Sequence, residues 1–250
     1  MLVDTHCHIY KEYYEDINSL IEKINLNKIS FIINNACNFN SSLEVLELVK
    51  EYENMYCAIG VHPEEQLIDV DKVINLIEQN LDNKKLIAVG EIGLDYFHSK
   101  DRKEEQVVMF KKQLDIAQKY NLPIIVHSRE ATKDTIDILK QYNLRGIIHC
   151  FNGSLEVAKE YIKLGYKLGI NGIVTFNNCK LIEVLKEISL NDFVLETDSP
   201  YLTPVPYRGK LNDPSYINTI IDFLSENLNI EKKVLIDSIY DNVKNIFNII

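Results

Sequence analysis

The 250-residue chain has no tryptophan, and it also lacks any long apolar run. A membrane-spanning helix needs about 20 consecutive apolar residues, and no segment comes near that length. Asp4 and His6 interrupt the N-terminal stretch where the apolar part of a secretory signal would lie. The sequence therefore predicts a cytoplasmic protein with no membrane partner.

Paired cysteines are absent as well. The five cysteines are an odd number and form no Cys-x-x-Cys motif, which argues against a zinc ribbon or a disulfide framework. Cys7, Cys57 and Cys150 lie in apolar runs, so we expect them to be buried free thiols. This cysteine usage is typical of a protein from a reducing compartment.

Positive charge is scarce. Lys and Arg number 27 against 37 Asp and Glu, which gives a formal net charge of −10. Nucleic-acid-binding proteins usually carry a basic surface that neutralises phosphates, so the sequence excludes a broad electrostatic DNA groove. A smaller positively charged site remains compatible with this composition. The hydrophobic fraction of 46% and the charged fraction of 26% are ordinary globular values.

Eight short apolar runs rich in β-branched residues recur along the chain. Runs of this kind, without polar alternation, are typical of strands buried on both faces of a parallel sheet. Segments with helical spacing separate them, and successive runs start about 27 residues apart, enough for one strand, one helix and two loops. The runs begin near Leu2, Ile29, Tyr56, Leu86, Pro123, Gly146, Tyr166 and Phe193.

This alternation predicts an α/β fold, a single (β/α)8 barrel of the TIM type that occupies residues 1–250. An open, doubly wound sheet is the alternative, because barrel closure leaves no mark in a sequence. Four of the six prolines fall between residues 200 and 214, which predicts one long functional loop after the eighth strand. Two extra C-terminal helices, near Pro214–Asn227 and Glu231–Asn248, would pack on the outside.

The histidines are not spread evenly along the predicted strands. Five of the six lie at the carboxyl ends of strands, the end at which barrel enzymes place their chemistry. One acidic residue ends the fourth predicted strand and another ends the eighth. The clustered residues are His6, His8, His62, Glu91, His127, His149 and Asp198.

These residue types in this arrangement indicate a metal centre. His6 and His8 are two apart on one strand, so both imidazoles point to the same side and can bind one ion. Glu91 ends an otherwise apolar strand, where a lone carboxylate is costly unless it is paired or bound to metal. Its two oxygens can bridge two cations, and His127 and His149 would then bind the second.

Asp198 could bind one ion and accept a proton from its water. Glu196, two residues deeper on the same face, would support the ligands rather than bind metal. Mixed nitrogen and oxygen ligands suit Zn²⁺, Mn²⁺ or Fe²⁺, whereas Mg²⁺ prefers oxygen ligands alone. Two ions about 3.5–4 Å apart would activate water and stabilise the oxygens of an in-line displacement.

Six segments, in order along essentially the whole chain, resemble the TatD family of metal-dependent deoxyribonucleases, within the amidohydrolase-like barrel enzymes. They are Asp4-Thr5-His6-Cys7-His8, Gly60-Val61-His62-Pro63, Val89-Gly90-Glu91-Ile92-Gly93-Leu94-Asp95-Tyr96, Leu122-Pro123-Ile124-Ile125-Val126-His127-Ser128-Arg129, His149-Cys150-Phe151-Asn152-Gly153-Ser154 and Leu195-Glu196-Thr197-Asp198-Ser199-Pro200-Tyr201-Leu202.

The resemblance implies a TIM-type barrel that hydrolyses DNA phosphodiester bonds with two divalent cations. It implies one ion on His6, His8, Glu91 and Asp198, and another on Glu91, His127 and His149. Asp198 and Glu91 would be the catalytic residues, and the family's usual association with Mg²⁺ leaves Mg²⁺, Zn²⁺ and Mn²⁺ as candidates. A barrel mouth suits a single strand or a 3′ end better than continuous duplex. We expect a monomer that needs no protein partner.

Four residues are candidates for binding substrate phosphates, because Arg offers two parallel donors and Lys a point charge. They are His62, Arg129, Arg208 and Lys210.

The loop after the eighth strand departs from the family pattern. That pattern typically places a histidine before Arg208-Gly209-Lys210 and a basic residue after it, whereas this chain has Tyr207 and Leu211. The departure leaves the predicted metal ligands unchanged and alters the predicted substrate contacts. Tyr201 and Tyr207 could stack on a base.

Two other functions compete with a nuclease. Many related barrels hydrolyse small amides, lactones or esters and bridge their metals with a carbamylated lysine on the fourth strand. Here that strand ends in Glu91, and its lysines, Lys84 and Lys85, lie at its start. A non-catalytic binding protein would have lost some of the ligands, and none is lost.

Overall fold

The computed structural model describes residues 1–249, and it shows one parallel sheet of eight strands in chain order. Each strand pairs with the next one along the chain, from the first pair to the last. The strands are β1 (Leu2–Cys7), β2 (Ile29–Asn35), β3 (Met55–Ile59), β4 (Leu86–Asp95), β5 (Ile124–Arg129), β6 (Gly146–Ile148), β7 (Tyr166–Ile170) and β8 (Phe193–Leu195).

The first and last strands meet and bring the sheet nearly to closure. The backbone N–H of His8 donates to Ser199 O at 2.7 Å, and that of Asp198 donates to His6 O at 2.9 Å. A parallel bridge also joins Cys7 and Ser199. The predicted (β/α)8 barrel is confirmed, and the open sheet is excluded.

The strands begin within one residue of the predicted positions. Strand β5 begins at Ile124, whose N–H donates to Arg145 O at 3.0 Å. The preceding Pro123 has no N–H to contribute to the ladder. Strand β4 is longer than expected, since it continues past Glu91 to Asp95. Glu91 therefore lies within the strand rather than at its end.

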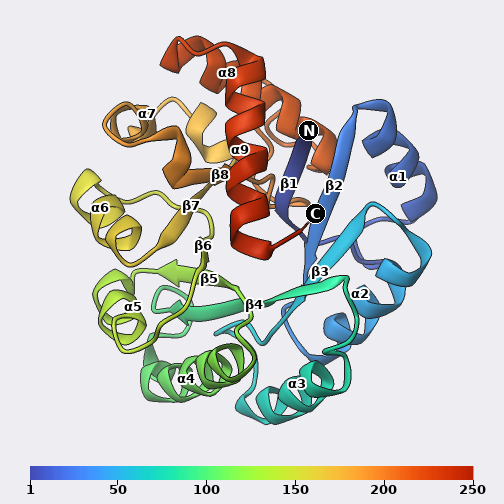
Figure 1. Cartoon of the computed structure of the whole chain (residues 1–250), viewed down its shortest axis with the longest axis vertical. Coiled ribbons are helices and arrows are strands. Elements are labelled where there is room, and N and C mark those ends of the chain that lie inside the picture. Colours follow the sequence, from blue (N-terminus) through green and yellow to red (C-terminus); the bar gives the residue numbers. More distant parts are fainter. Residues whose placement is uncertain (250) are drawn as a thin grey trace.

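Helices between the strands form an outer ring around the barrel (Figure 1). The predicted helical spacing is confirmed in α1, which buries Ile17, Leu20, Ile21 and Ile24, and the side chain of Asp16 caps its first turn. The helices of the ring are α1 (Ile17–Leu26), α2 (Phe39–Glu51), α3 (Leu67–Gln79), α4 (Lys103–Tyr120), α5 (Thr132–Leu139), α6 (Leu155–Lys163) and α7 (Leu181–Leu185).

Two helices complete the chain, α8 (Ile217–Leu228) and α9 (Lys232–Phe247). The first turn of the predicted helix from Pro214 is a separate 3-10 turn, η4 (Pro214–Tyr216). Helix α9 crosses one end of the barrel, with the chain's N-terminus beside it (Figure 1). This is the amino end of the strands, because Asn242 Nδ2 in α9 donates to Phe193 O, at the start of β8, at 2.8 Å.

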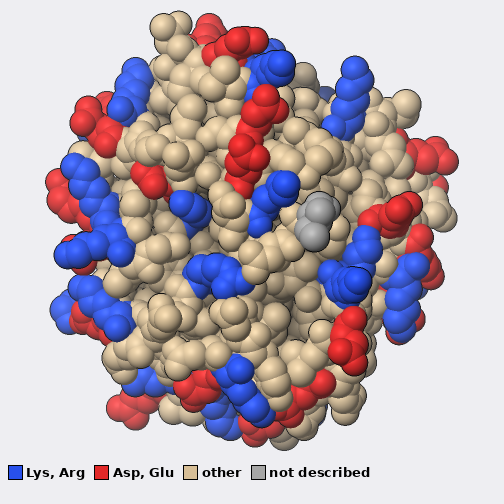
Figure 2. Space-filling view, viewed as in Figure 1, with Lys and Arg blue, Asp and Glu red and all other residues tan. Residues whose placement is uncertain are grey.

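The face that α9 crosses carries mixed charge. Figure 2 shows basic and acidic side chains interspersed over it, with no broad basic area. Among residues 1–249, no helix has the length and apolar character needed to cross a bilayer.

The long loop after β8 is held firmly at its base and exposed at its tip. Thr203 Oγ1 donates to Lys210 O at 2.6 Å, and Val205 N–H donates to Thr175 Oγ1 at 2.9 Å. Thr175 belongs to η2 (Gly172–Thr175), the 3-10 turn after β7. Residues 205–211 are all exposed, so the loop presents its tip to solvent at the carboxyl end of the barrel.

Candidate metal centre

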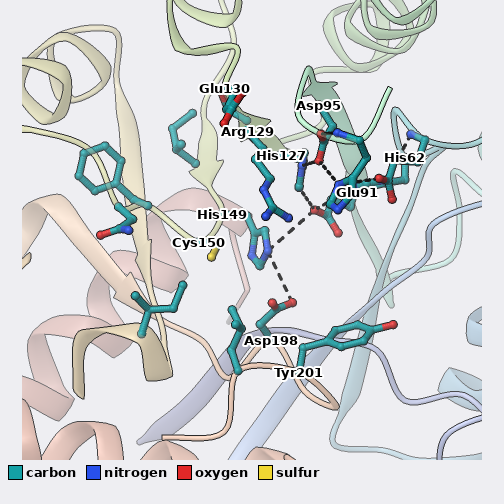
Figure 3. A pocket seen from close by; sticks show the side chains of 18 of the residues that line it. His62, Glu91, Asp95, His127, Arg129, Glu130, His149, Cys150, Asp198 and Tyr201 are labelled. Atoms are coloured by element: carbon teal, nitrogen blue, oxygen red, sulfur yellow. Dashed lines mark hydrogen bonds and ion pairs between the residues drawn. The ribbon is translucent and has the colours of Figure 1, made fainter. Parts of the chain in front are cut away.

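The carboxyl ends of five strands bring the predicted ligands together beneath a cavity of about 1050 Å³. Figure 3 shows Glu91 between His127 and His149, and His149 also faces Asp198. The six clustered residues are His6, His8, Glu91, His127, His149 and Asp198, and all but His127 are buried. Strands β1, β4, β5, β6 and β8 supply them, so their proximity depends on closure of the barrel.

Four donor atoms of this cluster have the spacing of a metal site. His6 Nε2 lies 3.1 Å from His8 Nε2, 3.3 Å from Glu91 Oε2 and 3.8 Å from Asp198 Oδ1. His8 Nε2 lies 3.6 Å from each of the same two oxygens. Ligands about 2.1 Å from a tetrahedral ion are about 3.4 Å apart. The four atoms can therefore hold one cation.

The second oxygen of Glu91 faces a different set of nitrogens. Glu91 Oε1 lies 2.9 Å from His127 Nδ1, 3.7 Å from His62 Nε2 and 3.8 Å from His149 Nε2. His149 Nε2 is also 3.5 Å from Asp198 Oδ1. The two oxygens of one carboxylate thus point to two groups of imidazoles, the geometry that a bridging ligand requires.

His62 lies next to the proposed metal ligands. It was predicted to contact substrate phosphate, and His62, Glu91 and His127 also form a group that could hold an ion. Burial lowers the pKa of His62 to about 3, and the neighbouring His127 adds to the effect. A neutral imidazole at this position can accept a hydrogen bond or bind a cation.

Two carboxylates orient the imidazoles of His127 and His149 from behind. Asp95 Oδ2 lies 2.9 Å from His127 Nε2, on the side of the ring away from Glu91. Glu196 Oε1 lies 2.9 Å from His149 Nδ1, as its depth on the strand predicts. Such partners fix which nitrogen of an imidazole is free to bind metal.

The carboxylates stay ionised despite their burial. Burial alone would raise the pKa of Glu91, but His149 and His6 hold it well below its usual value. The pKa of Asp198 is lowered by His149 against the same effect of burial. Burial would lower the pKa of His149, but Glu196 and Asp198 raise it to about 10. The raised pKa of His149 reflects the negative charge of these carboxylates, which would equally favour a bound cation.

The predicted phosphate contacts fall into two groups. Arg129, at the end of β5, lines the cavity and reaches toward the cluster (Figure 3). Arg208 and Lys210 lie on the exposed tip of the loop after β8 and do not line the cavity. Tyr201 does line it, and its hydroxyl is hydrogen-bonded to that of Tyr13 at 2.8 Å.

Several residues of the site were missed in the sequence. Asp95 had no predicted role, although it is a second acid four residues after Glu91 in the same apolar strand. His98, the one histidine away from the predicted strand ends, has its Nδ1 3.2 Å from Asp95 Oδ2. Cys37 lines the cavity, with its Sγ 3.6 Å from His8 Nδ1.

Two of the three cysteines expected to be buried are buried. Cys7 and Cys57 have no exposed surface. Cys150 is partly exposed and lines the cavity, because it directly follows the buried His149 at the end of a short strand. The prediction for Cys150 was wrong.

Comparison with known proteins identifies the family of the chain. A family model described as TatD related DNase matches residues 3–248. The chain belongs to the TatD family. Relatives of this family include the uncharacterised metal-dependent hydrolase YabD of Bacillus subtilis, which is 37% identical with full coverage of both chains.

Other TatD relatives are also similar over nearly the whole chain. The uncharacterised metal-dependent hydrolase YcfH of Escherichia coli is 32% identical, over 99% of this chain and 96% of its own length. The crystal structure of YjjV, a TatD homologue from Escherichia coli, is 28% identical with a TM-score of 0.93, and it covers 100% of this chain and 98% of its own. The chain is thus a member of a family of metal-dependent hydrolases with a TIM barrel.

Proposed function

We propose that the protein is a deoxyribonuclease that uses two divalent cations to hydrolyse phosphodiester bonds in single-stranded DNA or at 3′ ends. The observation that carries the proposal is the geometry of the Glu91 carboxylate. Its two oxygens face two separate groups of donor atoms. The family model, described as TatD related DNase, gives it further support.

The residues present fit two cations. One set of donors is His6, His8, Glu91 and Asp198, and the other is Glu91, His127 and His149. All are neutral imidazoles or carboxylates once cations displace their protons. Mn²⁺, Zn²⁺ and Mg²⁺ are the candidates, and when bound such a pair activates water and neutralises charge on the transferring phosphoryl group.

The chain's own residues supply the remaining functions. Asp198 is ionised and borders both donor groups, so it is placed to accept a proton from the attacking water. Arg129 lines the cavity, and its guanidinium can bind a phosphate through two parallel N–H donors. His127 is held in orientation by Asp95.

Cleavage of a fluorescently labelled 20-nucleotide single strand tests the proposal. We expect activity with Mn²⁺ or Mg²⁺, and a loss of about 100- to 10,000-fold in D198N, the range in which general-base catalysis contributes. H127A should lose activity as well. Lys84→Ala is a suitable control, because Lys84 is exposed at the opposite, amino end of the barrel.

A second assay with the same enzyme tests the small-molecule alternative. A panel of amides, lactones and carboxylic esters is assayed with the same metal-loaded enzyme. Hydrolysis of a panel member, with no cleavage of DNA by any divalent metal, would overturn the nuclease proposal.

We further propose that the enzyme works as a cytoplasmic monomer. All the proposed ligands belong to one chain, so no second copy is needed to complete the site. Light scattering of the purified protein should give a mass close to 29.0 kDa. A mass twice as large at assay concentrations would contradict this expectation.

A further inference from the structure

The loops around the barrel mouth differ in charge. The loops after β7 and β8, residues 171–180 and 199–212, contain no Asp or Glu but carry Lys180, Arg208 and Lys210. On the β3–β5 side, Glu64, Glu65 and Glu130 lie along the cavity together with Arg129. A strand of phosphates that leaves the cavity would meet carboxylates on the β3–β5 side, whereas the loops after β7 and β8 offer cations alone.

The arginines of the chain differ in what their guanidinium groups do. Arg102 donates to Glu105 and to two backbone carbonyls, and Arg145 donates to Asn121 and to Ile246 O. Within residues 1–249, neither Arg129 nor Arg208 donates a side-chain hydrogen bond or has a carboxylate within 4.0 Å. The arginines at the mouth are thus the ones with all their donors available.

Aromatic rings hold the cations of the β8 loop in place. The guanidinium of Arg208 lies 3.9 Å from the centroid of the Phe176 ring, and Lys210 Nζ lies 5.4 Å from that of Tyr207. Tyr207 in turn packs against Tyr216, with ring centroids 5.0 Å apart. A stacked guanidinium keeps its N–H edges free, so it can bind a phosphate while it remains on the ring.

This surface is continuous with the cavity. Phe176 follows η2, whose Ile173 lines the cavity, and Tyr201 and Leu202 line it at the start of the β8 loop. The loop is fastened to η2 through Val205 and Thr175. Cations and exposed aromatic rings on a firm support are the features with which proteins bind single-stranded nucleic acid.

We propose that Phe176, Tyr207, Arg208 and Lys210 form a strand-binding shelf, which holds single-stranded DNA where it leaves the cavity. Arg208 and Lys210 bind backbone phosphates of nucleotides beyond the one in the cavity, and Tyr207 offers a face for a base. The shelf rests on the proposed nuclease function and adds to it a path for the strand, over β7 and β8.

Binding in the absence of metal tests the shelf by itself. Anisotropy of fluorescein-labelled dT12 is measured in EDTA, which prevents cleavage, for the wild type, the double variant R208A/K210A and the control K84A. We expect the double variant to raise the Kd at least tenfold and K84A to leave it unchanged. The slope of log Kd against log salt should fall by about 1.4, or about 0.7 for each lost phosphate contact.

Kinetics with metal test the path of the strand. We expect the wild-type KM to fall as single strands lengthen from 2 to 12 nucleotides, and the KM of R208A/K210A to stay constant. The loss of kcat/KM in the double variant should be smaller on the dinucleotide than on the 12-nucleotide strand, since the shelf contacts nucleotides beyond the one in the cavity. Tyr207→Phe should behave as wild type and Tyr207→Ala should weaken binding.

The two proposals can fail separately. If the wild type cleaves no DNA but binds dT12 through Arg208 and Lys210, the nuclease proposal is wrong and the shelf stands as a binding surface. If the double variant binds dT12 as the wild type does, or keeps the wild-type dependence of KM on length, the shelf is wrong. An equal loss on the dinucleotide and on dT12 would also overturn it, because the residues would then act within the cavity.

Discussion

At the scale of single residues, each imidazole of the second donor group has one nitrogen for the cluster and one for a supporting acid. His127 presents Nδ1 to Glu91 and Nε2 to Asp95, whereas His149 presents Nε2 to Asp198 and Nδ1 to Glu196. The two rings thus use opposite nitrogens for the same purpose. The position of the supporting acid therefore determines which nitrogen of each ring faces the cluster.

Asp95→Asn is therefore expected to weaken metal binding without unfolding the protein. An amide accepts a weaker hydrogen bond from His127 and can rotate to offer its own N–H, so the affinity of the second donor group should fall about 10- to 100-fold. Titration of metal-free protein followed by elemental analysis measures this.

Asp134→Asn provides a matched control for this change. Asp134 accepts a hydrogen bond from Tyr96 at 2.9 Å and is not a partner of His127. Unchanged metal affinity in D95N would mean that Asp95 supports the local backbone instead, through its hydrogen bonds to the N–H groups of Phe97 and His98.

The six metal-ligand candidates could be predicted from the sequence because each is a polar residue in or directly after an apolar run. The sequence did not reveal the supporting contacts of Asp95, since these depend on the rotation of a ring on a neighbouring strand. It also placed Arg208 and Lys210 with Arg129 as phosphate contacts. Only the fold shows that Arg129 lines the cavity and that the other two lie on an outer loop.

At the scale of elements, the strands and the last helix were predictable, but the position of that helix across the amino end of the barrel was not. Runs such as residues 31–33 of β2 are apolar because both faces of the strand are covered, so composition alone locates them. The position of α9 depends on hydrogen bonds made at long range by single polar residues. Asn242 is buried and donates to both Leu190 O and Phe193 O at 2.8 Å.

We expect Asn242→Ala to destabilise the protein by about 1–3 kcal/mol. The substitution removes the Asn242 donor from the buried contact with Phe193 O and from the partly buried Leu190 O, which keeps a contact with Ser238 Oγ at 3.4 Å. Urea unfolding monitored by circular dichroism measures the change. Asn227→Ala is the control, because Asn227 is exposed in α8 and donates only to Phe223 O in its own helix. Equal stability of the two variants would show that α9 does not hold the barrel end closed.

At the scale of the whole molecule, the cluster joins segments that are far apart in the chain. His6 and Asp198 are separated by 192 positions, so a cation bound between them favours the closed barrel over the unfolded chain. The acidic composition of the chain does not oppose stabilisation by a bound cation. The cation would be bound by ionised carboxylates of the cluster and not by the outer surface.

Removal of metal should therefore lower the melting temperature. A cation present at about 100 times its Kd stabilises the folded state by about 2.7 kcal/mol, which corresponds to roughly 5–10 °C for a chain of this size. Calorimetry in EDTA and after addition of Mn²⁺ measures the shift. D198N should show a smaller shift, and an identical melting temperature in all conditions would contradict a metal centre in this cluster.

The position of α9 has one more consequence. Met1 is exposed and directly precedes β1 at the end of the barrel that α9 covers, whereas His6 and His8 lie at the opposite, carboxyl end of that strand. The last helix also ends on the covered side (Figure 1). The molecule can thus be anchored to a bead, an electrode or a fused carrier protein through either end of its chain. In every case the cavity would face away from the attachment and toward free solution.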